Sequence, residues 1–324
     1  MIVRWGLGEL EPLLDELDVD RPLLVTSERF AELALPVERR FTGVRPHTPT
    51  GTVRAASVAA EGADALVPLG GGSAIDTAKA VSAETGLPVI SVPTTYSGAE
   101  WTSFYGMRDE DRRAKGGGSG ARLAGIVYEP RLTLDLPREI TGGTALNALA
   151  HSAEALYTRT RSPVGDLDAL SGATLIAAAL PPALADGRDL EARTHLLEGA
   201  MHAGAALAAS FMGLAHAIAQ ALGGRYGLPH GAMNAIVLAP TLRYNQPVAG
   251  EAIRQFGAAV GDDDAAAAVE RLARLAGFER LRDFAVPQDE LPEVARAAVE
   301  RPAAKANPRR ATSDDVAELL ETVW

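Results

Sequence analysis

The sequence predicts two domains, an α/β domain followed by an all-helical domain. Up to residue 138, short apolar runs alternate with stretches of helical periodicity, which is typical of parallel strands joined by crossover helices. From residue 139 onward the periodicity is helical, alanine is abundant and β-branched runs are nearly absent. We therefore expect an α/β domain over residues 1–138 and a helical domain over residues 139–324.

The first domain is expected to alternate strands and helices in a regular order. Glycine and proline mark most of the boundaries between these segments. The expected elements are a strand at 21–27, a helix at 52–63, a strand that enters three glycines at 64–73, a helix at 74–86, a strand that enters a loop at 87–98, an exposed turn at 108–120 and a strand at 121–130.

Composition excludes several classes of function. The formal net charge is −11, so the chain has no bulk electrostatic attraction for nucleic acid or anionic lipid. It has no cysteine, which excludes disulfides, thiolate nucleophiles and zinc–thiolate sites and fits a reducing cytoplasm. The N-terminus does not resemble a signal peptide. The apolar run 200–222 is interrupted by polar residues and indicates a buried helix pair, so we expect a cytoplasmic protein without a membrane partner.

Three glycines stand between an expected strand and an expected helix, in the segment LGGGSAIDTAKA. Glycine allows close approach of the backbone to a ligand, and the N-terminus of the following helix offers free N–H groups to an anion. A pyrophosphate fits this description. The spacing matches neither the G-x-G-x-x-G fingerprint nor a Walker A loop, so a simple tight turn explains these residues equally well.

A second polar loop follows the next expected strand, in SVPTTYSGAE. Thr94, Thr95 and Ser97 place hydroxyl groups just beyond the end of that strand. In open parallel sheets, ligands bind outside these carboxyl ends. An ordinary polar loop is the alternative, but two such loops one strand–helix unit apart favour a binding site.

The segment TGGTALNALAHSAEALY predicts a helix with Asn147 and His151 one turn apart on the same face. A carboxylate in place of Asn147 would give half of a metal site. An amide leaves three possibilities open, namely a metal site, a disabled metal site or two polar residues on a helix.

Four motifs in this order resemble the iron-containing (group III) alcohol dehydrogenases, and within them most of all the maleylacetate reductase branch. They are GGGSAIDTAK, PTTYSGAE, TALNALAHSAEALY and GLAHAIAQALGGRYGLPHGAMNAIVLAP. The resemblance implies a Rossmann-like N-terminal domain, a helical C-terminal domain, the superfold shared with dehydroquinate synthases and an active site in the cleft. It also implies NADH or NADPH as cofactor and a homodimer.

The resemblance further implies which residues bind the cofactor. The glycine motif would hold the pyrophosphate, and the threonine loop would lie near the ribose and the nicotinamide. The implied cofactor-binding residues are Gly70, Gly71, Gly72, Ser73, Asp76, Lys79, Thr94, Thr95 and Ser97.

Metal-dependent members of that family carry one Asp and three His as ligands. The corresponding positions here hold Asn147, His151, His216 and His230, and Gln220 replaces a further His that the family often shows. The only anionic ligand is therefore missing, which disfavours tight iron binding, although three His can hold zinc. We expect a disabled metal site without a bound metal, in which these four residues are catalytic. If a metal binds, the three histidines are its expected ligands.

The implied reaction is reduction of maleylacetate to 3-oxoadipate, or of a related activated carbonyl or enone acid. Hydride would add to the alkene carbon β to the ketone, and a protonated imidazole would stabilise the enolate and supply a proton. An anionic substrate requires cations. Lys115, Arg225 and Arg243 are the nearest basic residues in the sequence, and each is otherwise an ordinary surface charge.

Two alternatives remain open from the sequence. One is an iron- or zinc-dependent dehydrogenase of a small alcohol or polyol. The other is a non-redox lyase or cyclase that resembles the dehydroquinate synthases.

Overall fold

The computed structural model describes the backbone of residues 1–109 and 114–324 and the side chains of residues 1–108 and 116–324. The chain forms two compact units. The first comprises Met1–Thr95 and Ala99–Thr133, and the second comprises Tyr96–Gly98 and Leu134–Trp324. The sequence placed the boundary at residue 138. The structure divides the chain five residues earlier and groups part of the threonine loop with the helical unit.

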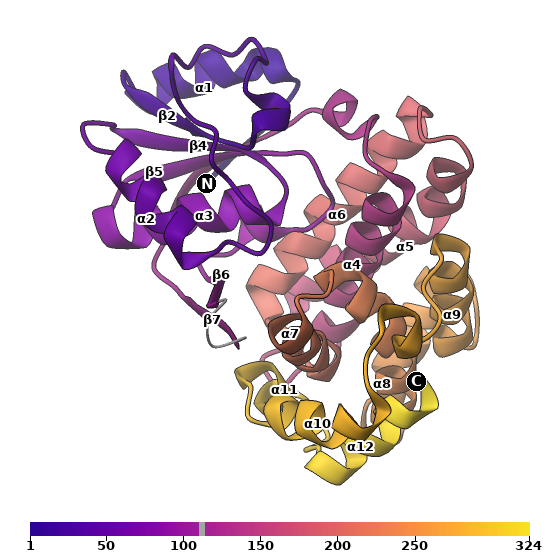
Figure 1. Cartoon of the computed structure of the whole chain (residues 1–324). Coiled ribbons are helices and arrows are strands. Elements are labelled where there is room, and N and C mark those ends of the chain that lie inside the picture. The colour runs from indigo at the N-terminus through magenta and orange to yellow at the C-terminus, as the bar shows by residue number, and fades with distance from the viewer. Residues whose placement is uncertain (110–113) are drawn as a thin grey trace. The chain divides into compact units, whose positions relative to one another are not determined.

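The first unit is built on a parallel sheet of six strands, which confirms the predicted fold class (Figure 1). The strand order is β1 (Ile2–Trp5), β8 (Arg122–Tyr128), β5 (Pro88–Pro93), β4 (Ala65–Gly70), β2 (Pro22–Val25) and β3 (Arg39–Phe41).

Helices cover both faces of this sheet. Leu24 points toward α1 (Leu10–Glu16), in a cluster with Leu10 and Leu13. Its neighbour Leu23 belongs to the opposite cluster, with residues of α2 (Thr50–Ala59) and α3 (Gly72–Thr85). Because successive strand residues face opposite sides, a strand buried on both faces must be apolar throughout. This explains the continuous apolar runs.

The sequence did not predict three features of the first unit. β1 and β3 are edge strands of only four and three residues, too short to show a periodicity. Part of the exposed turn expected at 108–120 instead belongs to the antiparallel strands β6 (Tyr105–Asp109) and β7 (Ala114–Gly118), while residues 110–113 of that expected turn lie outside the described residues. The glycines that suggested a turn lie in β7, where Gly117 and Gly118 closely face Tyr105.

The second unit is helical throughout its described residues, apart from connecting segments. Its α-helices are α4 (Arg138–Ala155), α5 (Pro163–Ala185), α6 (Leu190–Ser210), α7 (Leu214–Tyr226), α8 (His230–Ala259), α9 (Ala265–Ala276), α10 (Leu291–Val299), α11 (Pro302–Ala306) and α12 (Ser313–Thr322). Short 3₁₀ helices complete the chain at Leu7–Glu9, Glu28–Phe30, Ala99–Trp101, Pro130–Thr133, Leu281–Phe284 and Gln288–Glu290.

One helix, α5, is long and apolar enough to cross a membrane by length and composition alone. It packs against α4 and α6, and its buried positions recur along the face that meets them. We interpret it as a core helix of this unit. The apolar run 200–222 forms the expected helix pair, since α6 and α7 meet at an angle of 101°.

The corner between α6 and α7 depends on unusual backbone geometry. Phe211 has φ of 65°, a conformation that bulky residues rarely adopt. Gly213 follows, and an added Cβ there would lie 2.9 Å from the carboxylate of Glu154. Because α7 begins directly after this corner, His216 lies in the first turn of α7.

Small residues also bring α4 and α8 together. A Cβ on Gly231, at the start of α8, would lie only 2.3 Å from the carbonyl oxygen of Gly143 in α4. No side chain fits in that space, so only glycine permits this approach. The result is that residues of α4 one and two turns further along lie close to the first turns of α8.

Candidate active site

The glycine loop, residues 70–73, joins β4 to α3 and lies beside the start of the threonine loop, residues 94–98. Gly70 pairs with Pro93 at the ends of their strands, and the amide of Thr94 donates to the Gly70 carbonyl at 3.0 Å. A Cβ on Gly71 would lie 2.8 Å from the side chain of Thr95. The two loops expected to bind the cofactor are thus in contact at the carboxyl ends of neighbouring strands.

The glycine loop has the features of an anion-binding site. Gly71 is the N-cap of α3 and has no side chain to bond the free N–H groups of the first turn. The buried hydroxyl of Thr95 has no hydrogen-bond partner among the described residues. Backbone donors, the positive end of the helix dipole and a spare hydroxyl fit the pyrophosphate of a dinucleotide.

Sequence reasoning missed a third segment of this edge, residues 47–49. The amide of His47 donates to the Ser73 hydroxyl at 3.1 Å, and His47 and Thr48 have φ of 64° and 51°. Strained non-glycine residues often mark a functional loop. The signal in the sequence was the polar stretch HTPT before α2, but β3 was not recognised, so nothing placed this stretch at the end of a strand.

Asp76 and Lys79, expected at the cofactor, form an ion pair within the first unit, in which Lys79 is buried and Asp76 is partly exposed. Lys79 is 1% exposed, and its ammonium group lies 2.9 Å from Asp76 and donates to the carbonyls of Ala99 and Phe104 at 2.8 and 2.6 Å. With its donors occupied, this ammonium stabilises the segment that follows the threonine loop. We expect its influence on the cofactor to be indirect.

The three histidines of the helical unit lie together. His151 from α4 stacks on His216 from α7, with ring centroids 4.5 Å apart, and His216 lies 5.7 Å from His230 at the start of α8. His151 and His216 are buried, at 4% and 1% exposure. The structure therefore brings these histidines together, although His151 and His216 are 65 residues apart in the sequence and His216 and His230 are 14 apart.

A buried carboxylate holds His216, and sequence reasoning missed it. Glu154, also on α4, is fully buried and accepts from the amides of Gly213 and Ala215 at 2.8 and 2.7 Å. The Glu154 carboxylate also contacts Nδ1 of His216 at 2.5 Å. The available signal was the spacing of three residues after His151, which places Glu154 on a neighbouring part of the same helix face.

This contact determines the protonation pattern of His216. A carboxylate can only accept, so Nδ1 carries the proton, and Nε2 is left to exchange a proton with a bound molecule. Nε2 is buried and has no partner among the described residues.

His151 has the opposite character. Burial, and then the neighbouring His216 ring, lowers the pKa of His151 well below its usual value. Its ring is therefore neutral at neutral pH. Two stacked imidazoles with different environments divide the roles, with His216 able to carry a proton and His151 remaining neutral.

Asn147 is bonded to its neighbours at both ends of its amide. Its nitrogen donates to the carbonyl of Ser97 at 3.2 Å, and its oxygen accepts from Asn234 of α8 at 2.7 Å. The same Asn234 nitrogen lies 3.2 Å from Nε2 of His230. Ser97, expected near the cofactor, thus contacts the histidine cluster through its backbone.

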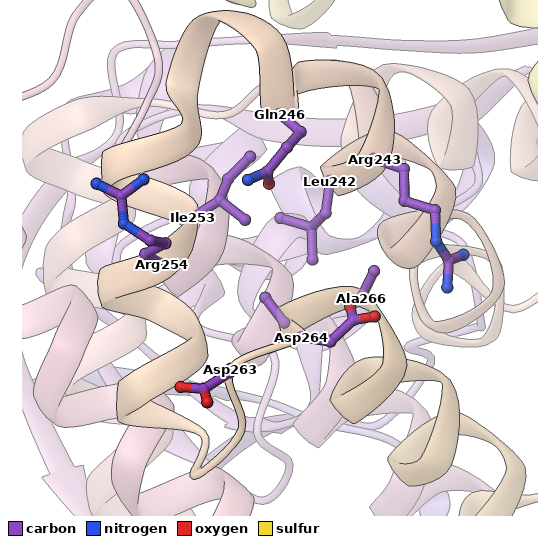
Figure 2. A pocket seen from close by; sticks show the side chains of 9 residues that line it. Leu242, Arg243, Gln246, Ile253, Arg254, Asp263, Asp264 and Ala266 are labelled. Carbon is purple, nitrogen blue, oxygen red and sulfur yellow. The ribbon is translucent and has the colours of Figure 1, made fainter.

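The expected substrate cations do not join the histidines. Arg225 pairs with Glu290 and Arg243 with Glu270, both on the exposed surface. Arg243 lies 13 residues beyond His230 on α8, which is about 20 Å along a helix. It lines a different pocket, of about 350 Å³, between α8 and α9 (Figure 2). The expectation for Arg243 was wrong because sequence proximity ignores the length of α8.

Lys115 lies in β7, where its backbone pairs with Arg108, but its side chain lies outside the described part of the structure. Arg225 lies nine residues beyond His216 on α7, about 13 Å along the helix axis. Arg225 forms a surface ion pair with Glu290 and donates a hydrogen bond to the hydroxyl of Tyr226.

Comparison with known proteins decides the family. Residues 3–124 match the family model for iron-containing alcohol dehydrogenase, and residues 141–324 match the model for the C-terminal part of the Fe-containing alcohol dehydrogenase family.

The chain belongs to the iron-containing alcohol dehydrogenase family.

Within that family it falls in the maleylacetate reductase branch. A maleylacetate reductase from Burkholderia cepacia is 37% identical, over 99% of this chain and 95% of the relative. Maleylacetate reductase 1 from Cupriavidus pinatubonensis is 35% identical, over 98% and 93%. The solved maleylacetate reductase of a Rhizobium species superposes with a TM-score of 0.90 at 29% identity, covering 100% of this chain and 95% of that one.

These matches make the chain an NAD(P)-dependent oxidoreductase that uses a nicotinamide cofactor. This resolves one alternative from the sequence, because a non-redox lyase or cyclase is not the class to which these relatives belong. The glycine loop and the threonine loop are the described residues that fit the cofactor.

The family name implies iron, but the residues at the ligand positions do not fit it. Asn147 has only one oxygen, and that oxygen already accepts from Asn234, whereas a carboxylate would have a second oxygen for a metal. Three neutral imidazoles would leave a divalent ion without charge compensation. Among the described residues, no group of three or more His, Cys, Asp or Glu side chains is arranged to hold a metal.

The glycine loop gives the first prediction. Gly71→Val should raise the dissociation constant of NADH or NADPH at least about tenfold, or ~1.4 kcal/mol. The added side chain would meet Thr95 and would hold the pyrophosphate away from α3. Isothermal titration calorimetry measures this constant. Gly8→Val is the control, because no atom lies within 4 Å of its Cβ position. Unchanged affinity in a folded Gly71→Val protein would contradict the assignment.

The Glu154 carboxylate gives the second prediction. Glu154→Gln keeps the shape but removes the charge that stabilises a protonated His216, so we expect kcat/KM to fall about 100-fold. Glu251→Gln, on the exposed surface of α8, is the matched control. A kcat/KM for Glu154→Gln equal to that of the unmodified enzyme would contradict this role for Glu154.

Proposed function

We propose that this protein reduces maleylacetate, or a closely related enone diacid, with NADH or NADPH and without a metal ion. The observation that carries the proposal is a pair of features of the histidine cluster. An amide occupies the position of the anionic ligand, and a buried carboxylate holds His216 in a form that can donate a proton. The relatives named above act on maleylacetate, which supports this substrate class.

The proposed reaction is a conjugate reduction. Hydride from the nicotinamide adds to the alkene carbon β to the ketone, and the electron pair of the alkene moves to form the enolate. A proton then adds to the carbon between that position and the ketone. One hydride and one proton convert the enone to the saturated ketone, and the nicotinamide is oxidised.

Each histidine has a distinct part in this proposal. His216 holds the proton on Nε2 and faces the developing negative charge, while Glu154 balances the imidazolium. His151 remains neutral, and His230 packs beside His216. Conjugation already activates the acceptor, so the reaction depends less on a Lewis acid than does the reduction of an isolated ketone.

A zinc-dependent alcohol dehydrogenase is the second candidate. The observation in its favour is that three imidazoles lie together, and that Nδ1 of His151 and Nε2 of His216 are buried without partners among the described residues. Three histidines are a known zinc ligand set. Against it stands the engaged oxygen of Asn147.

We also propose a homodimer and a cytoplasmic location. Both rest on the family resemblance and composition, as does the absence of nucleic-acid and membrane partners.

The direct test is a cofactor-oxidation assay with purified protein. We expect one NADH or NADPH to be consumed for each maleylacetate, with 3-oxoadipate as product, and at least 100-fold lower kcat/KM for the saturated ketone. His216→Gln should lower kcat about 100- to 10,000-fold, because it removes the proton donor. His195→Gln, on the exposed side of α6, is the control.

Turnover of simple alcohols or aldehydes but not of maleylacetate would contradict the proposal and favour the second candidate. Full activity of His216→Gln would instead remove His216 from the proposed mechanism while leaving the substrate assignment intact.

A further inference from the structure

The side chain of Arg301 contacts α7, the helix that carries His216. Gln220 lies four residues after His216, which puts the two on the same face of α7, one turn apart. The oxygen of Gln220 accepts from Nη1 of Arg301 at 3.3 Å. Arg301 therefore contacts α7 at a residue one turn from His216.

The position of Arg301 is fixed by its surroundings. It is the N-cap residue of α11, and both α10 and α11 pack against α7 (Figure 1). Gln220 is itself held from the other side, where its nitrogen lies 3.6 Å from the sulfur of Met212. The guanidinium is thus oriented by a neutral amide on the same rigid helix as His216.

Arg301 is half-buried and has no carboxylate partner. Arg296, five residues before Arg301, pairs with Glu293. Among the described residues no acidic group pairs with Arg301, and its Nε is buried without a hydrogen-bond partner. Burial alone lowers its pKa from the usual arginine value. A half-buried guanidinium without a counter-ion costs stability, and a bound anion would offset that cost.

The substrate proposed above supplies such an anion. Maleylacetate carries a carboxylate at each end, a few bonds from the reacting enone. A guanidinium presents paired N–H donors that match a carboxylate in a planar, two-bond arrangement.

We propose that Arg301 binds one carboxylate of the substrate and that Gln220 orients its guanidinium for this contact. The inference rests on the proposed function for the identity of the substrate. It replaces the surface residues Arg225 and Arg243 as the source of the required positive charge. Arg301 then determines specificity for acids over neutral enones, whereas His216 serves the chemistry.

The test measures binding of the diacid 3-oxoadipate to the protein loaded with the oxidised cofactor that it prefers. Calorimetry on Arg301→Gln should show at least tenfold weaker binding, with Arg301→Lys intermediate because it keeps the charge but not the planar geometry. Arg296→Gln is the matched control, an exposed arginine on α10. Cofactor affinity and the thermal unfolding midpoint verify that each variant is folded.

A neutralised ligand separates charge recognition from general damage. The monomethyl ester at the carboxylate bound by Arg301 should bind the unmodified protein at least tenfold more weakly than the diacid does. It should bind Arg301→Gln and the unmodified protein with similar affinity. The proposal is wrong if Arg301→Gln and Arg301→Lys both bind the diacid with the affinity of the unmodified protein. It is also wrong if Arg301→Gln weakens the binding of the diacid and of both monoesters by the same factor.

The same data distinguish this inference from the proposed function. If the protein fails to reduce maleylacetate yet the diacid binds in an Arg301-dependent way, the carboxylate site stands and the reaction assignment fails. If maleylacetate is reduced but every affinity is independent of Arg301, the reaction stands and this inference fails.

Discussion

The carboxylate of Glu154 is the interaction on which the rest of the histidine cluster depends. It is fully buried on α4, and it binds two backbone amides at the corner between α6 and α7 as well as the His216 ring. A buried carboxylate is tolerated only when donors satisfy it, and these three donors come from one short segment. The same group therefore fixes the corner, orients His216 and supplies the negative charge that a protonated ring requires.

Charge balance explains why an amide is acceptable at residue 147. A metal site needs an anionic ligand to offset the ion, but a site that works with one imidazolium is already balanced by Glu154. Asn147 then serves packing and hydrogen bonding, since it connects the Ser97 backbone to Asn234 and through it to His230. The pKa of His151 is lowered first by burial of the ring and then by the neighbouring His216.

The sequence predicted what depends on periodicity and spacing along one chain. The parallel sheet, the two loops and the three histidines were recognised because apolar runs, glycines and matching motifs are local signals. Glu154 and Arg301 were missed because each contacts the site's helices through a neighbour distant in sequence, 62 residues for Glu154 and 81 for Arg301. Lys79 was implied by the family resemblance and Arg243 by its proximity in the sequence. Lys79 forms an ion pair with Asp76, and Arg243 lies near the middle of the long helix α8 and pairs with Glu270.

Metal content tests the central claim most directly, namely that the lack of an acidic side chain at residue 147 is what separates this site from a metal site. The unmodified protein and Asn147→Asp should be loaded side by side with iron or zinc, dialysed and analysed by plasma mass spectrometry. We predict well under one metal per chain and chelator-resistant reductase activity in the unmodified protein, with a higher metal content in Asn147→Asp. One tightly bound metal per unmodified chain, with activity lost to chelator and restored by that metal, would contradict the account.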